Sequence, residues 1–353
     1  MTRPIGYYVH HHGDGHRQRA IALADHLGER VTLIGTGLAD RSGGHAVLDL
    51  PDDRLPDGTF DGQDGVGRPP SLHYAPIDHE GVRQRAALLT GWIARARPAL
   101  LVVDVSVEIA MLARLASVPT IYVRLNGRRV DRPHLDAFEG ATALLAPFHA
   151  ELDDEETPDG IRRKTFYAPG IGPRAKIGVV EDDLILGVVG RGGSQCTGED
   201  WPDAARATPH LRWQIIGPST VPADCPANLS FLGWVTDAAD LVARAGVVVG
   251  AAGDGLVGAV LAARRPFLCI PEDRPFDEQR VKARRLHAAG AAITSANWPA
   301  PDDWPDLIER AHALATDNCA RLDDPDGARR TARWLAEIAD GTVQGRDSAG
   351  LGL

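Results

Sequence analysis

Histidines and glycines cluster in segment 10–16 (HHHGDGH), directly after a short apolar run. At such a turn of a parallel sheet, glycines allow a ligand to approach a helix N-terminus. His16 would open that helix, and the positive end of the helix dipole disfavours an imidazolium, which suits a general base. Gly13 and Gly15 would contact a substrate beside it. A histidine cluster alone is a weak signal for a metal, so we expect no metal site at His10–His12.

Two more glycine-rich turns follow apolar runs in the second half of the chain, at 190–195 (GRGGSQ) and 250–255 (GAAGDG). Consecutive glycines free backbone N–H groups to bind an anion, and two such turns fit a diphosphate better than one. For the turn at 190–195, the alternative to phosphate binding is a flexible turn between a strand and a helix. Asp254 would repel a phosphate, so it either faces sugar hydroxyls or caps a helix. The candidate ligand-binding residues of these two turns are Arg191, Gly192, Gly193, Ser194, Gln195, Gly253, Asp254 and Gly255.

Polar groups also stand at other expected strand ends. Asp277, Glu278 and Gln279 follow the run 266–270, and they could bind vicinal hydroxyls of a sugar. The alternative for Asp277 is a helix N-cap. Asn126 follows the run 120–123, and His73 follows the long acidic, Gly- and Pro-rich loop 51–70. We interpret both as candidate residues for binding a second substrate.

Short apolar runs alternate with amphipathic segments along the whole chain, and runs that are apolar throughout are typical of parallel strands covered on both faces. The Gly- and Pro-rich segment 169–183 interrupts this pattern. The expected strands are 5–9, 31–34, 46–50, 100–103, 120–123, 184–189, 211–216, 247–249 and 266–270. The expected helices are 16–27, 82–95, 107–115, 238–245, 256–264, 277–289, 306–315 and 327–339.

This alternation predicts an α/β protein with two tandem Rossmann-like domains that face each other across a cleft. Residues 1–168 would form the first domain, 169–183 a linker, and 184–326 the second domain. Residues 327–353 would form a final helix and tail that pack back on the first domain.

Composition excludes several classes of function. A chain of 353 residues fits two domains, and 38 basic against 48 acidic residues give a net charge of −10, which argues against general nucleic-acid binding. Four scattered cysteines without a CxxC pair indicate neither a zinc knuckle nor a disulfide scaffold. The first residues lack a signal-peptide core, and every apolar run is too short to span a membrane. We therefore expect a cytoplasmic protein.

The order of these motifs resembles the GT-B nucleotide-sugar glycosyltransferases. It is closest to the branch containing the N-acetylglucosaminyltransferase that makes the peptidoglycan lipid precursor. The resemblance rests on the His16 turn, on the two glycine loops, and on 277–279 with the following 284–286 (RRL) and 289–291 (AGA). Segment 231–235 (FLGWV) is similar to the base-binding segment of the family.

The resemblance implies an inverting, metal-independent glycosyltransferase without a cofactor. His16 would remove the acceptor proton, and Asp104 would support that histidine, unless it only caps the helix that follows. Trp234 and Val235 would contact the base of a nucleoside-diphosphate sugar, with a UDP-sugar as the first expectation. The acceptor would be a small molecule or a lipid-linked one, the latter with peripheral membrane contact.

The sequence departs from the family at two positions and leaves two rivals open. Ala259, or Gly258 with a shift of one residue, stands where the family has a ribose-binding glutamate, and Lys282 stands where asparagine is usual. One rival is a sugar-nucleotide epimerase or hydrolase, whose paired carboxylates would come from Glu108, Asp254 and Asp277. The other is a non-catalytic sugar-nucleotide-binding protein, motivated by the missing glutamate.

Overall fold

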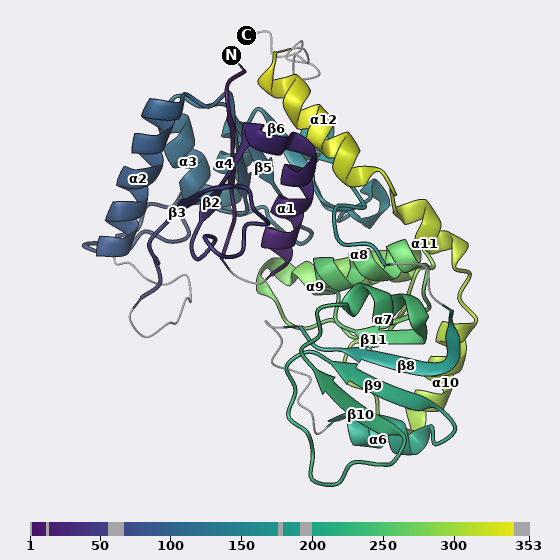
Figure 1. Ribbon diagram of the computed structural model, residues 1–353. Coiled ribbons are helices and arrows are strands. Elements are labelled where there is room, and N and C mark those ends of the chain that lie inside the picture. Colours follow the sequence, from purple (N-terminus) through teal and green to yellow (C-terminus); the bar gives the residue numbers. More distant parts are fainter. Residues whose placement is uncertain (1, 12–13, 56–66, 176–178, 191–199, 342–353) are drawn as a thin grey trace.

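The computed structural model describes residues 2–11, 14–55, 67–175, 179–190 and 200–341 (Figure 1). Its strands form two separate parallel sheets, one of seven strands and one of six, each with helices on both faces. This architecture is the predicted pair of Rossmann-like units. No helix in the described ranges is long and apolar enough to cross a lipid bilayer.

The first sheet has the strand order β3-β2-β1-β4-β5-β6-β7, and every neighbouring pair is parallel. The chain reverses its direction of sheet growth between β1 and β4, which makes this pair the switch point where such folds bind ligands. The strands are β1 Ile5–Tyr8, β2 Val31–Gly35, β3 Ala46–Asp49, β4 Leu100–Asp104, β5 Thr120–Val123, β6 Ala143–Ala146 and β7 Thr165–Tyr167. The helices are α1 Gly15–Leu27, α2 Glu80–Ala96, α3 Val107–Leu115, α4 Arg132–Gly140 and α5 Asp159–Lys164.

The second sheet repeats this plan with the order β10-β9-β8-β11-β12-β13, so its switch point lies between β8 and β11. The strands are β8 Glu181–Val188, β9 Arg212–Ile216, β10 Leu229–Gly233, β11 Ala245–Gly250, β12 Phe267–Cys269 and β13 Ile293–Thr294. The helices are α6 Trp201–Ala207, α7 Ala238–Arg244, α8 Asp254–Ala263, α9 Glu278–Ala288, α10 Trp304–His312, α11 Asp317–Leu322 and α12 Gly327–Ala339.

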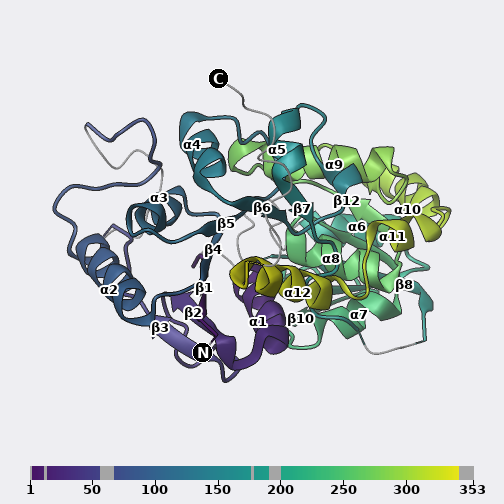
Figure 2. The same ribbon diagram turned by 90° about the horizontal axis from the view of Figure 1, so that it is seen from above.

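Apolar side chains on both faces of each sheet pack against the helices. In the first unit, α1 covers one face while α2, α3 and α4 cover the other, as the view from above shows (Figure 2). The second unit has one aromatic core, in which Trp201, Trp213, Trp298 and Trp304 contact one another. Its other core also takes in Phe148 and Leu152 from the segment after β6, so the two units share buried contacts.

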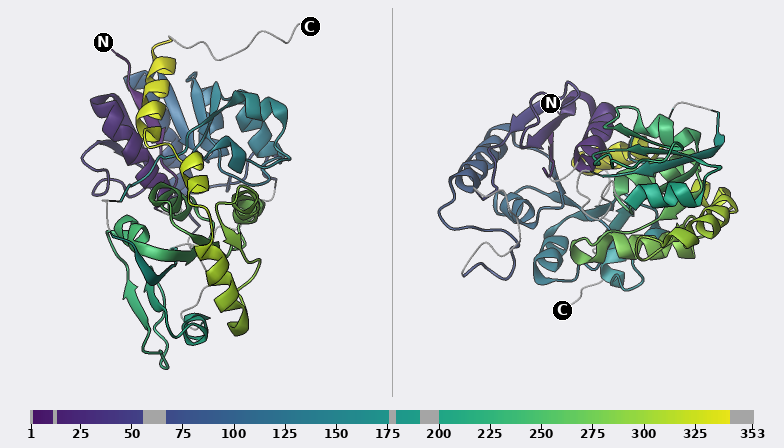
Figure 3. Two further views of the ribbon diagram at one scale, coloured as in Figure 1. Left: turned by 90° about the vertical axis from the view of Figure 1, so that its right-hand side faces the viewer. Right: turned by 90° about the horizontal axis from the view of Figure 1, so that it is seen from below.

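The last helix, α12, returns to the first unit and lies beside α1 (Figure 3). Leu335 is fully buried in the core of that unit. The Trp334 ring stacks on Phe166 with their centroids 4.3 Å apart and their planes within 7°. The chain therefore crosses between the units twice, once before β8 and once before α12.

All predicted strands and helices are present, and their ends differ from the prediction by at most three residues. The largest strand difference is β8, which begins at Glu181, inside the segment predicted as a linker. The prediction missed short elements whose residues give little periodic signal. They are α4, β6, α5, β7, α6, β10, β13 and α11.

Candidate functional site

The switch point of the first sheet brings His16 and Asp104 together across 88 residues of sequence. His16 is the second residue of α1, which follows β1, and Asp104 ends the neighbouring β4. Nδ1 of His16 lies 2.9 Å from Oδ1 of Asp104, whose side chain is fully buried. An Nδ1–H bonded to this carboxylate fixes the tautomer in which Nε2 is the basic nitrogen.

The alternative role of Asp104, as the cap of α3, is wrong. The N-cap of α3 is Ser106, whose hydroxyl oxygen accepts a hydrogen bond from the backbone N–H of Ile109 at 3.3 Å. The Asp104 carboxylate is directed instead to His16, Tyr7 and Arg19.

Arg19 is a member of this cluster that the sequence analysis missed. It lies one turn after His16 on α1 and is only 4 % exposed. Its Nε donates a hydrogen bond to Asp104, and Nη2 lies 3.1 Å from both carboxylate oxygens, which accounts for its two N–H groups. Nη2 also lies 3.1 Å from Nδ1 of His16, but with both of its N–H groups on Asp104 it leaves that ring nitrogen able to donate to the carboxylate. Burial alone would raise the pKa of Asp104, but the charge of Arg19 and the contact with His16 outweigh it and lower that pKa. The carboxylate is therefore ionised when it holds the imidazole.

Arg19 also reaches the second unit, where Nη1 lies 3.4 Å from Oδ2 of Asp254. Asp254 is the first residue of α8, which follows β11 at the second switch point. The other oxygen of its carboxylate forms an ion pair with the ammonium of Lys282 on α9, a side chain that is 1 % exposed. Burial would raise the pKa of Asp254, but Lys282 and Arg19 lower it to about 2. One chain of alternating charges thus links the two sheets.

A pocket lies beside this chain of charges, and its lining includes residues of α1, α8 and α9. The lower end of α1 meets α8 and α9 where the two units face each other (Figure 1). The segment 169–174 that connects the two units forms another side of the pocket. Gly258 and Ala259 both line the pocket, so the position expected for a ribose-binding glutamate carries no carboxylate. Other lining residues are Gly15, Gln18, Arg19, Phe148, Asp254, Gly255 and Lys282.

The segment predicted to bind the sugar hydroxyls makes protein contacts. Gln279 is buried, and its amide oxygen accepts hydrogen bonds from the backbone N–H groups of Ala252 and Glu272. Glu278 accepts a hydrogen bond from Arg129 of the first unit at 2.7 Å. Asp277 stands at the N-cap of α9 but makes no capping bond, so the structure does not support that alternative. Sugar binding by these three residues stays a prediction.

The loop after β5 docks on the turn Pro275–Asp277 that precedes α9. The backbone N–H of Arg128 donates a hydrogen bond to the carbonyl of Phe276 at 2.7 Å. Gly127 permits this approach, because it has a φ of +100° and a Cβ there would lie 2.5 Å from the same carbonyl oxygen. Asn126, one residue earlier, is buried and donates its amide N–H to the carbonyl of Leu152 at 2.6 Å. Its predicted contact with an acceptor stays a prediction.

His73, Asp131 and His134 form a hydrogen-bonded triad beside this loop. Each imidazole places one nitrogen 2.5 Å from a different oxygen of Asp131. Within the described ranges, these three residues are the one group of histidine, cysteine and acidic side chains close enough to share a metal ion.

Arg129 argues against a metal in the triad. Its Nη1 lies 3.2 Å from Nε2 of His134, and a guanidinium can only donate. Nε2 must therefore accept, which leaves the proton on Nδ1 and the metal-binding lone pair absent. Burial lowers the pKa of His134 to about 4, despite the opposing hydrogen bond to Asp131. His134 is thus neutral near pH 7.

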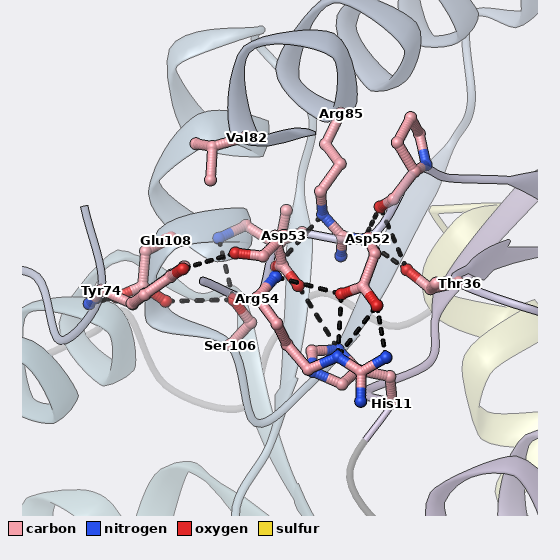
Figure 4. Close-up of polar contacts among 12 residues, drawn as sticks. His11, Thr36, Asp52, Asp53, Arg54, Tyr74, Val82, Arg85, Ser106 and Glu108 are labelled. Carbon is pink, nitrogen blue, oxygen red and sulfur yellow. Dashed lines mark hydrogen bonds and ion pairs between the residues drawn. The ribbon is translucent and has the colours of Figure 1, made fainter. Parts of the chain in front are cut away.

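A network of polar side chains, which we call the polar wall, follows the carboxyl ends of β1, β2, β3 and β4. It includes His11, Thr36, Asp52, Asp53, Arg54, Arg85, Ser106 and Glu108 (Figure 4). The buried Arg85 on α2 donates hydrogen bonds to the hydroxyl of Tyr8 at 2.6 Å and to the carbonyl of Pro51 at 2.7 Å. It also forms an ion pair with Asp53, which lies 3.7 Å from His11. A carboxylate oxygen of Glu108 accepts hydrogen bonds from the backbone N–H groups of His73 and Tyr74. These contacts hold the segments on either side of loop 51–70 next to the His16 turn.

The remaining predicted residues lie outside the described ranges or at the surface. Gly13, Arg191, Gly192, Gly193, Ser194 and Gln195 fall outside the described residues. Trp234 is 53 % exposed just after β10, while Val235 is half-buried against the core of the second unit. Gly253 is the N-cap of α8 and Gly255 its second residue. Base and phosphate binding by these residues stay predictions.

No protein-family model and no curated protein sequence matches this chain. Solved structures do match it over nearly its whole length. The glycotransferase of kitacinnamycin is 15 % identical with a TM-score of 0.74, and the match covers 96 % of this chain and 100 % of that one. MurG from Acinetobacter baumannii is 15 % identical with a TM-score of 0.65, covering 95 % and 99 %. The glycosyltransferase VinC in complex with dTDP is 14 % identical with a TM-score of 0.65, covering 96 % and 100 %. The chain therefore has the GT-B glycosyltransferase fold, which confirms the predicted fold.

Proposed function

We propose that this protein is an inverting, metal-independent glycosyltransferase that moves a sugar from a nucleoside-diphosphate sugar to an acceptor hydroxyl. The observation that carries the proposal is the His16–Asp104 pair. It stands at the switch point of the first sheet, and Arg19 connects it to the first residue of α8 at the switch point of the second sheet. A base beside one crevice and a helix N-terminus beside the other suit transfer between two substrates.

In the proposed mechanism, the acceptor lies on the first unit with its hydroxyl at Nε2 of His16. The acceptor oxygen attacks the anomeric carbon as its proton passes to Nε2, and the bond from that carbon to the diphosphate oxygen breaks on the opposite face. Attack from the opposite face inverts the configuration of the sugar. The ionised Asp104 carboxylate then stabilises the imidazolium through Nδ1–H.

The donor would lie mainly on the second unit, with its base near Trp234 and Val235. Its diphosphate would bind between the glycine loops 192–195 and 253–255. Backbone N–H groups at the start of α8 would stabilise the charge on the leaving diphosphate, which is the task of a metal ion in metal-dependent enzymes. His73, whose backbone N–H donates a hydrogen bond to Glu108, and Asn126 would lie on the acceptor side.

We keep a UDP-sugar as the first donor to test. A dTDP-sugar comes second, because VinC, which shares the fold, binds dTDP in its structure. The acceptor is proposed to be a small molecule or a lipid-linked one, and the site of action to be the cytoplasm.

One observation favours a second candidate, a non-catalytic sugar-nucleotide-binding protein. Gly258 and Ala259 give the pocket no carboxylate where one would bind ribose. The epimerase or hydrolase alternative has no such support. Its three candidate carboxylates bind different partners, since Glu108 accepts from backbone N–H groups, Asp254 pairs with Lys282, and Asp277 pairs with Arg128.

A panel of UDP-, GDP- and dTDP-sugars tests the proposal. The protein is incubated with each donor, with and without a mixture of hydroxyl acceptors, and the products are followed by mass spectrometry. Sugar transfer supports the proposed function, and NMR of the product then shows whether the anomeric configuration has inverted. Turnover without an acceptor would indicate an epimerase or hydrolase. Binding without any turnover would indicate the second candidate.

A further inference from the structure

The Asp254 carboxylate lies between two buried cations that come from different units. Lys282 on α9 pairs with Oδ1, and Arg19 on α1 lies 3.4 Å from Oδ2. Asp254 is the one acceptor that Lys282 contacts within the described ranges. An ammonium has three N–H donors, so two of them are left for another acceptor. A buried cation with unused donors is ready to bind a second anion.

This carboxylate makes no capping hydrogen bond to its own helix. The N-cap of α8 is Gly253, which has no side chain, and Asp254 makes no capping bond although it is the first residue of the helix. The first-turn N–H groups therefore receive no side-chain cap. A Cβ added at Gly253 or Gly255 would meet no atom within 4 Å, so the approach to these N–H groups is open.

Three positive groups thus converge on one place: the start of α8, Lys282 and Arg19. Two nitrogens of Arg19, Nε and Nη2, already donate hydrogen bonds to Asp104. Among the residues that the structure describes, Asp254 is the one acidic side chain that pairs with both cations. A diphosphate that reached the start of α8 would meet this carboxylate, and like charges repel at contact distance.

We propose that Asp254 sets the affinity for the donor, because its carboxylate competes with the donor diphosphate for Lys282 and Arg19. When the donor binds, a phosphate takes over the contact with Lys282, and Lys282 then stabilises the charge on the leaving group. This inference rests on the proposed function, since it requires a nucleoside diphosphate at this site. It assigns a role to Lys282, a residue that differs from the asparagine usual at this position.

Calorimetry with UDP, dTDP and pyrophosphate tests the competition. Asp254→Asn should bind all three at least about tenfold more tightly than wild type, because removing a like charge from contact distance gains at least that much. Lys282→Met should bind them at least about tenfold more weakly. Pyrophosphate carries neither base nor sugar, so its binding reports on the anion contacts alone.

Two further variants separate competition from a general effect of charge or folding. Asp273→Asn removes an acid from the same unit, but that side chain is exposed and pairs with Arg280, so its affinities should equal those of wild type. The double variant with Asp254→Asn and Lys282→Met should lose the gain in affinity. If Asp254→Asn is less stable than wild type, melting curves can replace calorimetry as the test of binding. Because this variant should bind pyrophosphate more tightly, pyrophosphate should raise its Tm more than it raises the Tm of wild type.

The outcomes distinguish this inference from the proposed function. If wild type binds the nucleoside diphosphates and Asp254→Asn binds pyrophosphate no more tightly, the carboxylate does not compete and the inference is overturned. If Asp254→Asn weakens a nucleotide sugar but leaves pyrophosphate unchanged, Asp254 contacts the sugar instead, which also overturns it. If wild type binds none of the three probes, the proposed function fails, and the inference fails with it.

Discussion

Replacing His16 and Asp104 separately should affect activity and stability to different degrees. We expect the His16 variant to lose more activity and the Asp104 variant to lose more stability. His16→Ala removes one of the three side chains that contact the Asp104 carboxylate. Tyr7 and the paired nitrogens of Arg19 remain in place. The lost contact is a single charge-assisted hydrogen bond, so we expect the free energy of unfolding to fall by at most about 2 kcal/mol.

Asp104→Asn should cost more stability, because it leaves Arg19 with a buried charge. That side chain is 4 % exposed, and its other acid, Asp254, lies 3.4 Å away and is shared with Lys282. Removing one partner of a buried ion pair costs about 3–5 kcal/mol. For a domain of this size, such a loss corresponds to a fall in Tm on the order of 10 °C.

The order should be reversed for activity, so that His16→Ala loses more activity than Asp104→Asn. His16→Ala loses the proposed general base, and a general base contributes about 10²–10⁴-fold to the rate. Asp104→Asn keeps Nε2 and should lose less activity per folded molecule. Urea denaturation gives the stabilities, initial rates at saturating donor give the activities, and calorimetry should find donor affinity unchanged in His16→Ala.

Tyr7→Phe is the matched control, since it removes a single hydrogen bond to Asp104 at 3.2 Å and leaves both charges paired. It should change stability by about 1 kcal/mol and leave activity near that of wild type. Equal stability of Asp104→Asn and His16→Ala would refute the account of Arg19. More than half of wild-type activity in His16→Ala would remove His16 from the mechanism.

Three further predictions follow from the site. Activity should survive exhaustive treatment with EDTA, because in the proposed site backbone N–H groups and protein side chains, and not a metal ion, bind the leaving diphosphate; loss that Mn²⁺ or Mg²⁺ restores would contradict this. Gly253→Val should weaken nucleoside diphosphate binding in calorimetry while the melting curve stays near that of wild type, because a Cβ there meets no atom within 4 Å. The unfolded chain protonates His134 near its ordinary pKa of 6.5, whereas the folded protein does so near 4, so stability should fall by about 3 kcal/mol as the pH drops through that window. Urea unfolding at several pH values should show this slope in wild type and not in His134→Gln; parallel slopes would refute it.

Strong periodicity explains why the sequence predicted most elements. Runs such as Leu100–Asp104 are apolar at nearly every position, because both faces of the sheet are covered, and such runs have few other interpretations. The elements that were missed are short. α4 has nine residues, and β7 has three residues with half-buried side chains. These short elements are stabilised by packing against neighbouring elements, and the local pattern of apolar residues in the sequence does not reveal that packing.

The site residues also fall into those that the sequence could predict and those that it could not. His16 and Asp104 could be predicted, because each stands at a strand end that the fold brings to one crevice. Arg19 gave no signal, since an arginine on an amphipathic helix usually faces water, and nothing local shows that this one is buried. Lys282 was noticed only as a departure, and its partner Asp254 lies 28 residues away on another helix. The pairing of Arg129 with Glu278 spans 149 residues, so no spacing rule could reveal it.

The buried charges make the proposed catalytic pair depend on both units of the fold. Asp104 binds Arg19, Arg19 reaches Asp254, and Asp254 binds Lys282, so the signs alternate from the first sheet to the second. If the units separated, Arg19 would lose one acid and Asp254 one cation, and water would enter around both. The approach of α8 to α1 therefore stabilises the charged form of the cluster that orients His16. A donor that binds at the start of α8 acts on the same cluster, which ties the state of the donor site to the base that would use it.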